Sequence, residues 1–525
     1  MSAMKRNLPR AQLYFTPSPC EKILFAMETL EGSSWDVVIS GTGLPQSLLA
    51  LALSRSGKKI LHIDRNNYYG GDEAALSLQE AQEWSEKHKP SPTGASTVFG
   101  NAIARKLLAN DKLKASRAYS LALAPQLLYC RSALLSAVVA SQTHTQLDFQ
   151  AVATWFIVNA PPDGSASQAR LTKVPGGRED IFQDASLDLK AKRALMKFLR
   201  FVADYEQQLD TWDTVRSSPF ASFLEQKFGL PSAYHSPILA LALSAQSSDS
   251  TTVEFALPRI SRHLRSIGVF GPGFPAVSPK WGGLAEVGQV ACRAGAVGGG
   301  VYVLGKGLKE VQSTGSDLRL ELTGGEKISA QWLVGTSSEL GSAAIPAQQD
   351  SATIPVMSRS ISIISSPLPS LFLPPSEGGV SPVGAVVLIP SPNNDEPPVH
   401  IFAHSGDSGE CPADQCVLYG YVSQTSDVGI PRLRQAVDTL LDSIGDLQDL
   451  QVVWSMHWEQ RCPPKAQISD EDHIIALQSL SADLAFDDDI LTDVKSAWQR
   501  IAKPEDPGSF MIFEARDGTT DEDDE

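Results

Sequence analysis

The sequence lacks the short motifs that mark several large classes of enzyme. It contains no GxSxG elbow, no P-loop and no HExxH pair, which are the local patterns of α/β-hydrolases, P-loop nucleotide hydrolases and zinc peptidases. Its nine histidines follow no metal-ligand spacing. We therefore expect no catalytic residue and no metal site, which favours a binding function over catalysis.

Paired cysteines, basic charge and long apolar runs are also scarce. The cysteines are scattered without a CxxC pair, which favours a reducing, cytosolic compartment. Acidic residues outnumber Lys and Arg by 60 to 44, and the net charge of −16 argues against a nucleic-acid partner. No apolar run approaches the roughly 20 residues of a membrane-spanning helix.

The first recognisable unit begins at Trp35. The apolar run Trp35–Ser40 predicts a buried parallel strand, and the turn Gly41-Thr42-Gly43 follows it. A helix is expected at about 46–56, and the run Lys59–Ile63 predicts a second strand. Strand, glycine turn, helix and strand form one βαβ unit of a doubly wound α/β sheet.

The sheet domain is predicted to be discontinuous, because helical periodicity interrupts it. Its parts are expected at 35–118 and 261–505, around an inserted, mainly helical domain at 119–260. Short apolar runs late in the chain predict an additional β-sheet. Residues 1–34, with four basic residues, are interpreted as a disordered extension, with a targeting peptide as the alternative. The acidic segment 506–525 is predicted to be a disordered tail.

The glycine turn is an incomplete dinucleotide fingerprint. Gly41 and Gly43 match the first two glycines of GxGxxG, and Asp64 stands where a ribose-binding acid would follow the second strand. Gln46 replaces the third glycine and places a long side chain beside the pyrophosphate path. We interpret the motif as vestigial and expect no cofactor. A flavin-dependent oxidoreductase is the alternative enzyme hypothesis.

Three stretches together resemble one known family. They are WDVVISGTGLPQSLLALALSRSGKKILHIDRNNYYGG from Trp35, PKWGGLAEVGQVACRAGAVGGGVYVL from Pro279, and KRALMKFLRFVADYE from Lys192. Their order and spacing are similar to those of the Rab GDP-dissociation-inhibitor and Rab escort superfamily. The resemblance implies a flavoprotein-like, GDI-like Rossmann-type fold whose function uses no flavin.

Within this superfamily the chain resembles the escort branch more than the inhibitor branch. The segments Ser54–Gly57 (SRSG) and Leu127–Leu135 (LLYCRSALL) are similar to the escort versions, and 525 residues exceed the compact inhibitor length. The large insertion of animal escort proteins is missing, as in a shorter, fungal-like form.

The escort branch implies a non-catalytic accessory protein with several partners. It binds newly made GDP-bound Rab GTPases and presents them to the alpha/beta heterodimer of Rab geranylgeranyltransferase. It then shields the attached geranylgeranyl lipid and delivers the product transiently to membranes from the cytosol. A dissociation inhibitor that recycles prenylated Rab is the alternative.

The resemblance also implies which residues face Rab. Tyr69 corresponds to a family tyrosine at the interface, while Glu286 and Arg293 match an acid and an arginine on the Rab-binding platform. The last two lie seven residues apart and would share a helix face. Val301 and Val303 stand where the family often has polar Thr and Met. Trp281 stands where the family usually has a tyrosine.

Apolar residues in two helical segments are candidates for a prenyl pocket. They are Leu127, Leu134, Leu135, Val138, Phe198, Leu199 and Val202. Burying even part of an isoprenoid chain would stabilise a complex by several kcal/mol. The alternative for any one of these residues is a permanently filled helix core. Phe201 lies off the main apolar stripe and is a candidate contact for the transferase.

Overall fold

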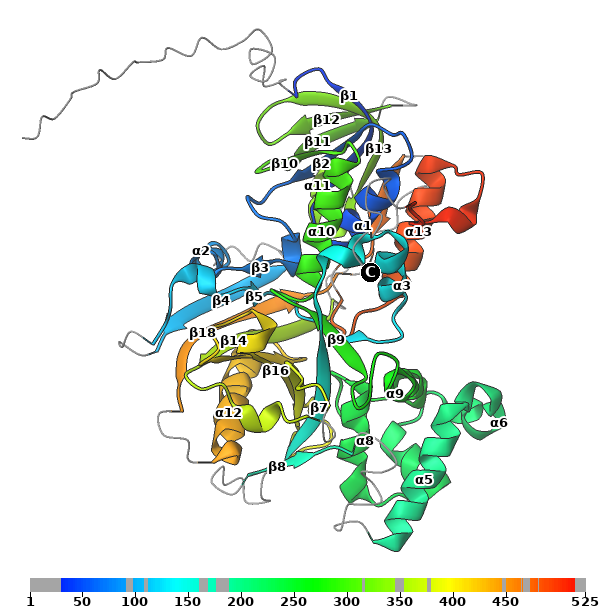
Figure 1. The fold of residues 1–525 in the computed structure, drawn as a ribbon, viewed down its shortest axis with the longest axis vertical. Helices are drawn as coiled ribbons and strands as arrows, with labels where there is room; N and C mark the ends of the chain where they lie inside the picture. The colour runs from blue at the N-terminus through cyan, green and yellow to red at the C-terminus, as the bar shows by residue number, and fades with distance from the viewer. Residues whose placement is uncertain are drawn as a thin grey trace, which may run out of the picture.

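The structure is a computed structural model, and it describes residues 30–90, 98–107, 112–159, 169–175, 188–313, 317–344, 354–374, 379–445, 450–463, 465, 473–479 and 481–514. The described chain forms two large sheets and a group of helices beside the second sheet (Figure 1). Segments far apart in the sequence alternate between the two sheets, so neither sheet is built from one continuous stretch of chain.

The first sheet contains seven described strands, and its parallel centre carries the glycine turn. In the order β10-β2-β1-β13, these strands are Val301–Leu304, Ile60–Asp64, Ser34–Ser40 and Lys327–Thr336. β19 (Ile474–Leu477) pairs parallel with β13, and β12 (Leu318–Leu322) and β11 (Leu308–Ser313) continue the sheet antiparallel. The predicted first two strands are therefore neighbours in a parallel sheet.

Helix α1 (Leu44–Leu53) lies on one face of this sheet, between α10 (Leu284–Val297) and α13 (Asp489–Ala502). All ten of its residues are buried, which explains why its sequence is almost continuously apolar. The opposite face of the sheet packs against the curled β11–β12 pair and α11 (Ser337–Ala344).

The second sheet contains ten described strands and is mostly antiparallel. Its order is β4-β18-β14-β17-β16-β15-β7-β9-β6, with β8 beside β7. These strands are Phe99–Lys106, Val452–Arg461, Val356–Ile364, Cys416–Val422, Val399–Ser405, Gly384–Ile389, Phe149–Asn159, Ala276–Pro279, Leu128–Tyr129 and, for β8, Arg170–Lys173. A separate two-stranded sheet pairs β3 (Ala75–Leu76) with β5 (Leu121–Ala122), and α2 (Leu78–Lys87) packs beside β4.

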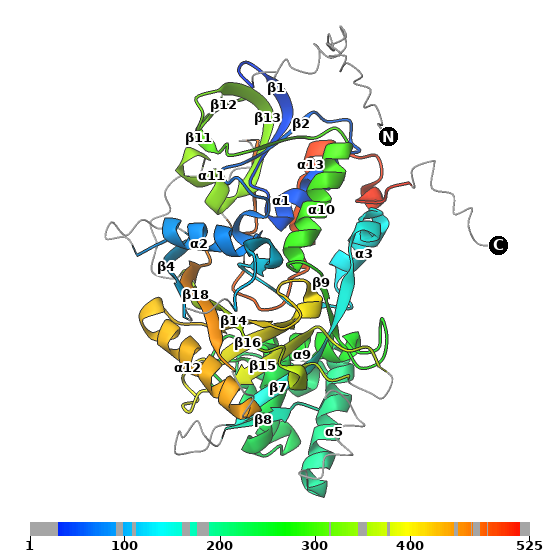
Figure 2. The same cartoon turned by 60° about the vertical axis from the view of Figure 1, so that its left-hand side comes forward.

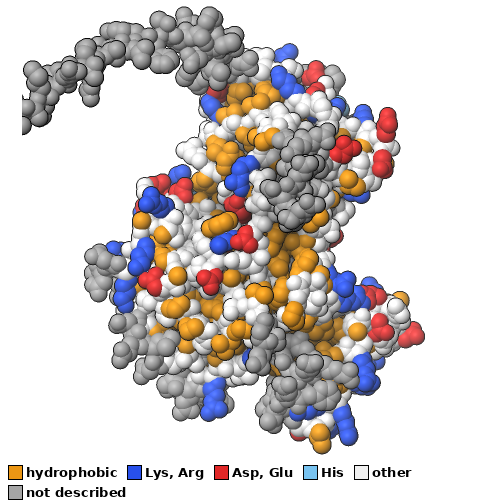
Figure 3. All heavy atoms as spheres, viewed as in Figure 1, with side chains coloured by type: hydrophobic (Ala, Val, Ile, Leu, Met, Phe, Trp, Pro, Cys, Tyr) orange, Lys and Arg blue, Asp and Glu red, His pale blue; other side chains and the backbone are white. Residues whose placement is uncertain are grey.

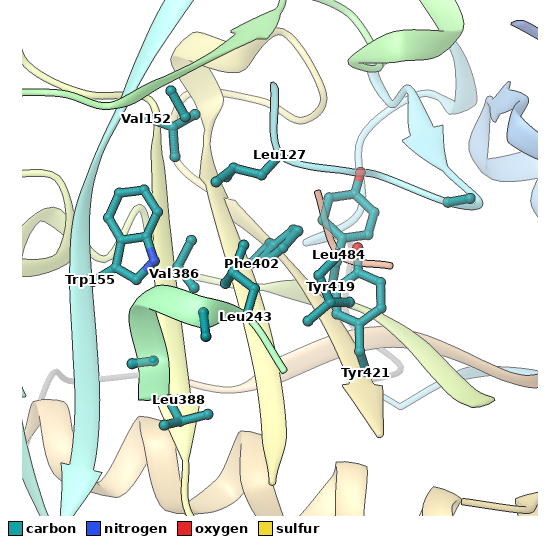
Figure 4. Packing of buried hydrophobic residues seen from close by; sticks show 14 of the residues in the cluster. Leu127, Val152, Trp155, Leu243, Val386, Leu388, Phe402, Tyr419, Tyr421 and Leu484 are labelled. Atoms are coloured by element: carbon teal, nitrogen blue, oxygen red, sulfur yellow. The ribbon is translucent and has the colours of Figure 1, made fainter. Parts of the chain in front are cut away.

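Helices cover both faces of the second sheet. α12 (Ser426–Ile444) packs on one face, as Figure 2 shows. The other face meets a helical unit of α5 (Leu189–Ala203), α6 (Leu209–Trp212), α7 (Phe220–Phe223), α8 (His235–Ala242) and α9 (Val253–Ser266). Figure 4 shows this contact, where Leu243 at the end of α8 lies against strand residues such as Val386 and Leu388.

The predicted boundaries of the inserted domain need correction. Residues 119–260 contain the strands β5, β6, β7 and β8 before the helical unit starts at Leu189, and that unit ends at Ser266. The long strand β7 is rich in β-branched and aromatic residues and is largely buried, so it shows no amphipathic period that would separate it from a helix. The predicted first part of the sheet domain, 35–118, also contributes β4 to the second sheet.

Both chain ends are ordered further than expected. Gly32 donates a backbone hydrogen bond to Lys327, and Ser34 already belongs to β1, although both fall in the predicted extension 1–34. In the predicted tail 506–525, Met511 is buried and the ring of Phe510 lies 5.5 Å from that of Trp498. These apolar residues precede the acidic run and anchor the segment to α13. Residues 1–29 and 515–525 lie outside the described residues.

We predict that Met511→Ala destabilises the protein by about 2–5 kcal/mol, because it removes a fully buried side chain and leaves a cavity. Met511 is 1% exposed, whereas its neighbour Ile512 is 63% exposed. Ile512→Ala is therefore the matched control and should change stability by less than about 0.5 kcal/mol. Urea unfolding of both variants measures the difference, and equal effects would contradict the packing of this segment.

Candidate functional site

The glycine turn between β1 and α1 is closed by Asp64 at the end of β2. The Asp64 Oδ2 atom accepts hydrogen bonds from the Thr42 backbone N–H (2.8 Å) and the Thr42 hydroxyl (2.6 Å). Its Oδ1 atom accepts from the Asn66 N–H at 2.7 Å. Both oxygens of the carboxylate that sequence analysis placed at a ribose site therefore bind the protein's own groups.

The amino end of α1 is also filled by side chains. The Leu44 N–H donates to Glu73 Oε2 at 2.5 Å, and Pro45 at the next position has no N–H to offer. Gln46 is buried and folds back toward Ser40. A Cβ atom at Gly43 would lie 2.9 Å from Gln46 Oε1 and 3.1 Å from Glu73 Oε2, so the space above this glycine is taken.

A dinucleotide of the kind suggested by the glycine turn does not fit these residues. Its pyrophosphate would need the N–H of Leu44 and would meet the carboxylate of Glu73 at the same helix end. Its ribose would need an oxygen of Asp64, and both are engaged. The motif Gly41, Gly43 and Asp64 keeps its backbone geometry here and lacks a free nucleotide seat.

Several carboxylates crowd one arginine beside this turn. Arg65 Nη2 lies 3.1 Å from Glu339 Oε1, and Asp72 and Asp64 are close enough to act on both groups. Burial, reinforced by the neighbouring carboxylates, raises the pKa of Glu339 to about 8 despite Arg65. Burial also raises the pKa of Glu73 to about 7, with a smaller contribution from Asp72.

Two of the residues predicted to face Rab form an ion pair on the outer side of α10. Arg293 Nη2 lies 2.7 Å from Glu286 Oε1, two helical turns away. The Arg293 side chain is 57% exposed and that of Glu286 15% exposed. Such an exposed pair contributes at most about 1 kcal/mol to stability, so little is lost if it opens when a partner binds. The exposed guanidinium of Arg293 is accessible to such a partner.

Tyr69 lies next to the same helix. It is half-buried, and burial together with Cys292 of α10 raises the pKa of its hydroxyl. Its neighbour Tyr68 packs against the large core below the first sheet. Tyr69 therefore lies near Cys292, which contacts Ser47 on the α1-facing side of α10, whereas Glu286 and Arg293 lie on the outer side. We call these three residues around α10 the α10 surface.

Val301 and Val303 lie on strand β10, which α10 leads into. They alternate with Tyr302, whose ring packs against His62 beneath Gly295 of α10, so the two valines face the other side of the sheet. Val303 joins the core on that side, and Val301 is 40% exposed. Among the described strands β10 is the sheet edge, so these residues adjoin the α10 surface without sharing its face.

A large apolar groove lies beside α3 (Ala133–Ala140), between the two sheets. Its volume is about 1260 Å³, above the roughly 300–1,000 Å³ of most small-molecule pockets. The loop between α9 and β9, the start of β7 and the segment 380–383 form its other walls. Figure 3 shows hydrophobic side chains gathered over this region. Its exposed apolar residues are Val139, Val269, Phe270 and Val380, with exposed fractions of 53%, 40%, 58% and 66%.

The predicted prenyl-pocket residues divide into two groups. Leu135 and Val138 line the groove, and Leu134 is buried behind them in the same core. Leu127 belongs to the core of the second sheet, as Figure 4 shows, and lines none of the described cavities. The α5 residues Phe198 and Val202 are fully buried in the helical unit, with Leu199 packed beside them. Their stripe is filled by protein, because Phe198 packs against the rings of Phe220 and Phe228.

Phe201 is not on an open face of α5. It is 5% exposed, and its ring lies 5.2 Å from Phe228 and 5.9 Å from Phe223. It forms the floor of a second groove of about 1100 Å³, whose rim carries the basic residues Lys192, Arg193, Lys197, Arg200 and Lys227. Phe201 lies off the main apolar stripe and is nevertheless buried, because the buried face of α5 is wider than that stripe.

Sequence reasoning missed the groove loop and the acids around Arg65. The segment Val269–Phe274 places two phenylalanines among glycine and proline, which is an unusual composition for a solvent-exposed turn and was the available signal. Glu73 and Glu339 gave no signal, because their roles depend on segments distant in the chain. Among the described residues, no group of His, Cys, Asp or Glu could hold a metal ion. The same residues form no helix that is long and apolar enough to cross a bilayer.

Comparison with known proteins identifies the family. Residues 31–372 match the profile of the GDP dissociation inhibitor family. The chain belongs to this family. Its fold agrees with that membership: it is similar to the crystal structure of RAB GDI from Plasmodium falciparum, with a TM-score of 0.64, 19% identity, and coverage of 90% of this chain and 98% of that one.

Two yeast relatives match different shares of their own length. The chain is 34% identical over 283 residues to Rab proteins geranylgeranyltransferase component A of Saccharomyces cerevisiae, covering 53% of this chain and 44% of that protein. It is 25% identical over 508 residues to an uncharacterized Rab geranylgeranyltransferase of Schizosaccharomyces pombe, covering 94% and 99%. The match therefore spans less than half of the first relative and nearly all of the second.

The predicted flavoprotein-like fold is confirmed by a second structural likeness. An oxidoreductase from Methanosarcina mazei has a TM-score of 0.56 at 12% identity, covering 88% of this chain and all of that one. This likeness establishes the fold alone. In this GDP dissociation inhibitor family member, the side chains around the glycine turn do not suit a dinucleotide.

We predict that the free energy of unfolding contributed by Glu339 falls as pH rises. Its pKa is raised from 4.5 to about 8 in the folded chain, so this stabilisation is complete below about pH 4.5 and is lost above about pH 8. Urea unfolding of the wild type and Glu339→Gln between about pH 5 and pH 9 measures the effect. The buried His263, whose pKa is lowered, contributes in the opposite sense and cancels in the difference. Parallel curves for the two proteins would contradict the prediction.

Proposed function

We propose that this chain is a Rab escort protein. It binds newly made, GDP-bound Rab GTPases, presents them to the alpha/beta heterodimer of Rab geranylgeranyltransferase and shields the attached lipid during delivery to membranes. The observation that carries the proposal is the conjunction of the α10 surface with a large apolar groove in a family member whose dinucleotide turn is closed. The names of the yeast relatives support the escort branch.

The α10 surface supplies what a Rab switch face requires. Tyr69 offers an aromatic ring with a polar tip, a residue type favoured at interfaces. Arg293 offers a planar cation that can bind a carboxylate with two parallel hydrogen bonds. Glu286, which accepts from Arg293, holds the guanidinium in place before binding. Charges of both signs fix the orientation of the partner more than they add affinity.

The apolar groove beside α3 is the proposed site of the prenylated Rab tail. A cysteine-bound isoprenoid is long, flexible and apolar, and each Å² of apolar surface removed from water contributes about 25 cal/mol. The exposed walls of the groove, Val139, Phe270 and Val380, are otherwise an aggregation hazard for a free protein. Leu135 and Val138 form the interior wall.

The basic groove on α5 is the proposed contact for the transferase. Lys197, Arg193 and Arg200 surround the buried ring of Phe201 on a chain whose net charge is −16. A local basic surface on an acidic protein steers an acidic partner to one place. Phe201 then supports the groove from below, and the surrounding cations make the contact.

A reconstituted assay tests the function. It contains the purified chain, the transferase heterodimer, unprenylated Rab with GDP, and geranylgeranyl diphosphate. Escort activity predicts that prenyl transfer to Rab depends on this chain. No transfer, combined with intact extraction of prenylated Rab from membranes, would instead assign the chain to the inhibitor branch.

We predict that Arg293→Ala weakens binding of unprenylated GDP-bound Rab by about 1–3 kcal/mol, the usual cost of truncating a central interfacial charge. The fold should be retained, because the side chain is 57% exposed. Lys309→Ala is the matched control, since Lys309 on β11 forms a similar exposed pair with Glu321 on β12. Titration calorimetry and thermal unfolding of both variants give the comparison. Unchanged Rab affinity in Arg293→Ala would remove this residue from the interface.

We predict that Val139→Asp lowers affinity for prenylated Rab at least tenfold and leaves affinity for unprenylated Rab unchanged. The introduced carboxylate would lose water on contact with the lipid and find no partner there. Val428→Asp on α12 is the control, because Val428 is 46% exposed on a helix away from the groove. Equal loss for both forms of Rab, or none for either, would exclude the groove as the lipid site.

A further inference from the structure

The loop from Arg65 to Glu73 joins β2 to the 3₁₀ turn Gly71–Glu73 and carries Tyr69 near its middle. Hydrogen bonds hold it at both ends. At the start, Asn66 N–H donates to Asp64 Oδ1 at 2.7 Å. After the tyrosines, Gly70 N–H donates to the Thr42 hydroxyl at 2.9 Å, and Glu73 then accepts from Leu44 N–H at 2.5 Å.

We propose that the carboxylate of Glu73 stands where a dinucleotide fold binds pyrophosphate, and that this internal anion anchors the loop which presents Tyr69 to Rab. The backbone groups that would bind a dinucleotide instead hold a protein-binding loop in place. Glu73 is thus a positioning residue that acts through Tyr69, and this second part rests on the proposed Rab-binding function.

The amino end of α1 is a position where a negatively charged group is favourable. The positive end of a helix dipole and its unpaired N–H groups favour a negative group at this position. The first turn of α1 contains no acidic residue of its own, and its N-cap is Gly43, which has no side chain. Glu73, 29 residues along the chain, supplies the missing charge from outside the helix.

The anchor bears directly on the position of Tyr69. Gly70 has φ of +99°, and a Cβ atom there would lie 2.8 Å from the Cα of Ala74, so the chain turns tightly between Tyr69 and Glu73. Only three residues separate Tyr69 from Glu73, so the backbone between them has little conformational freedom. Release of Glu73 would therefore free Tyr69 from its place beside Cys292 on α10.

Hydrogen exchange tests the anchor without any partner. The loop amides of Glu73→Ala should exchange at least tenfold faster than those of the wild type, because a hydrogen bond to a charged group is lost. Glu83→Ala, at a nearby exposed glutamate on α2, is the control and should change nothing. Measurement near pH 8 keeps Glu73 charged, since its pKa is about 7. Unchanged exchange in Glu73→Ala would overturn the anchor.

Added acetate tests whether an anion is what the helix end requires. Sodium acetate should slow loop exchange in Glu73→Ala by restoring a carboxylate at Leu44 N–H, whereas sodium chloride at equal ionic strength should not. Glu73→Gln should fall between the wild type and Glu73→Ala, because the amide oxygen can accept the hydrogen bond without the charge. Exchange that does not respond to acetate would overturn the replacement of phosphate by Glu73.

A double-mutant cycle tests whether Glu73 acts through Tyr69. Glu73→Ala should weaken Rab binding about fivefold or more on its own and should add nothing in the Tyr69→Ala background. Additive losses would overturn the positioning role. If the wild type binds no Rab, the proposed function fails, and the exchange experiments still decide whether Glu73 holds the loop.

Discussion

Complete burial of helix α1 is the constraint on which the arrangement of the sheet domain depends. All ten residues are buried, so the helix must be covered on every side by the first sheet, α10 and α13. Cβ atoms at Gly288 and Gly295 of α10 would make only ordinary contacts with α1, 3.8 Å from Ser47 Oγ and from the Ala50 backbone, whereas at Gly295 such an atom would lie 2.4 Å from the Tyr302 hydroxyl. Chain from three distant parts of the sequence must therefore assemble around one helix.

This packing determines which side chains remain available to a partner. Because the inner face of α10 is committed to α1, its polar residues Glu286 and Arg293 are confined to the outer face. The loop after β2 closes over the amino end of α1 and brings Tyr69 near Cys292 of α10. The α10 surface is thus a consequence of covering α1, and its residues need no separate framework.

The parts of this fold that local sequence determines were predictable. The apolar runs Trp35–Ser40 and Lys59–Ile63 predicted two neighbouring parallel strands, because a parallel strand buried on both faces has a continuous apolar sequence. Glu286 and Arg293 share a helix face as their spacing required. These predictions depended on periodicity within one element, or on a resemblance that spans one element and its neighbours.

Predictions that depended on distant contacts were incomplete. Phe201 was predicted to contact the transferase because it lies off the main apolar stripe, and the sequence does not show that Phe223 and Phe228 pack against its ring. Leu127 and Phe198 share the apolar character of Leu135, and only the tertiary fold separates filled core from groove wall. Apolar spacing identifies which residues leave water, and it does not tell whether protein or a ligand replaces the water.

The two glycines of the turn show why part of a dinucleotide fingerprint can be present in a protein that does not bind the cofactor there. Gly41 has φ of +90°, and a Cβ atom there would lie 2.5 Å from Glu339 Cγ and 2.8 Å from Gln46 Nε2. The positive φ and the side chains of Glu339 and Gln46 exclude a side chain at this position, whether or not a nucleotide binds. The presence of the first two glycines therefore reports the strand–turn–helix geometry. The residues that indicate whether a ligand can bind are those that occupy its hydrogen-bond donors or its space. Here Glu73 and Asp64 accept from the backbone N–H groups of Leu44 and Thr42, and Gln46 fills the space above Gly43.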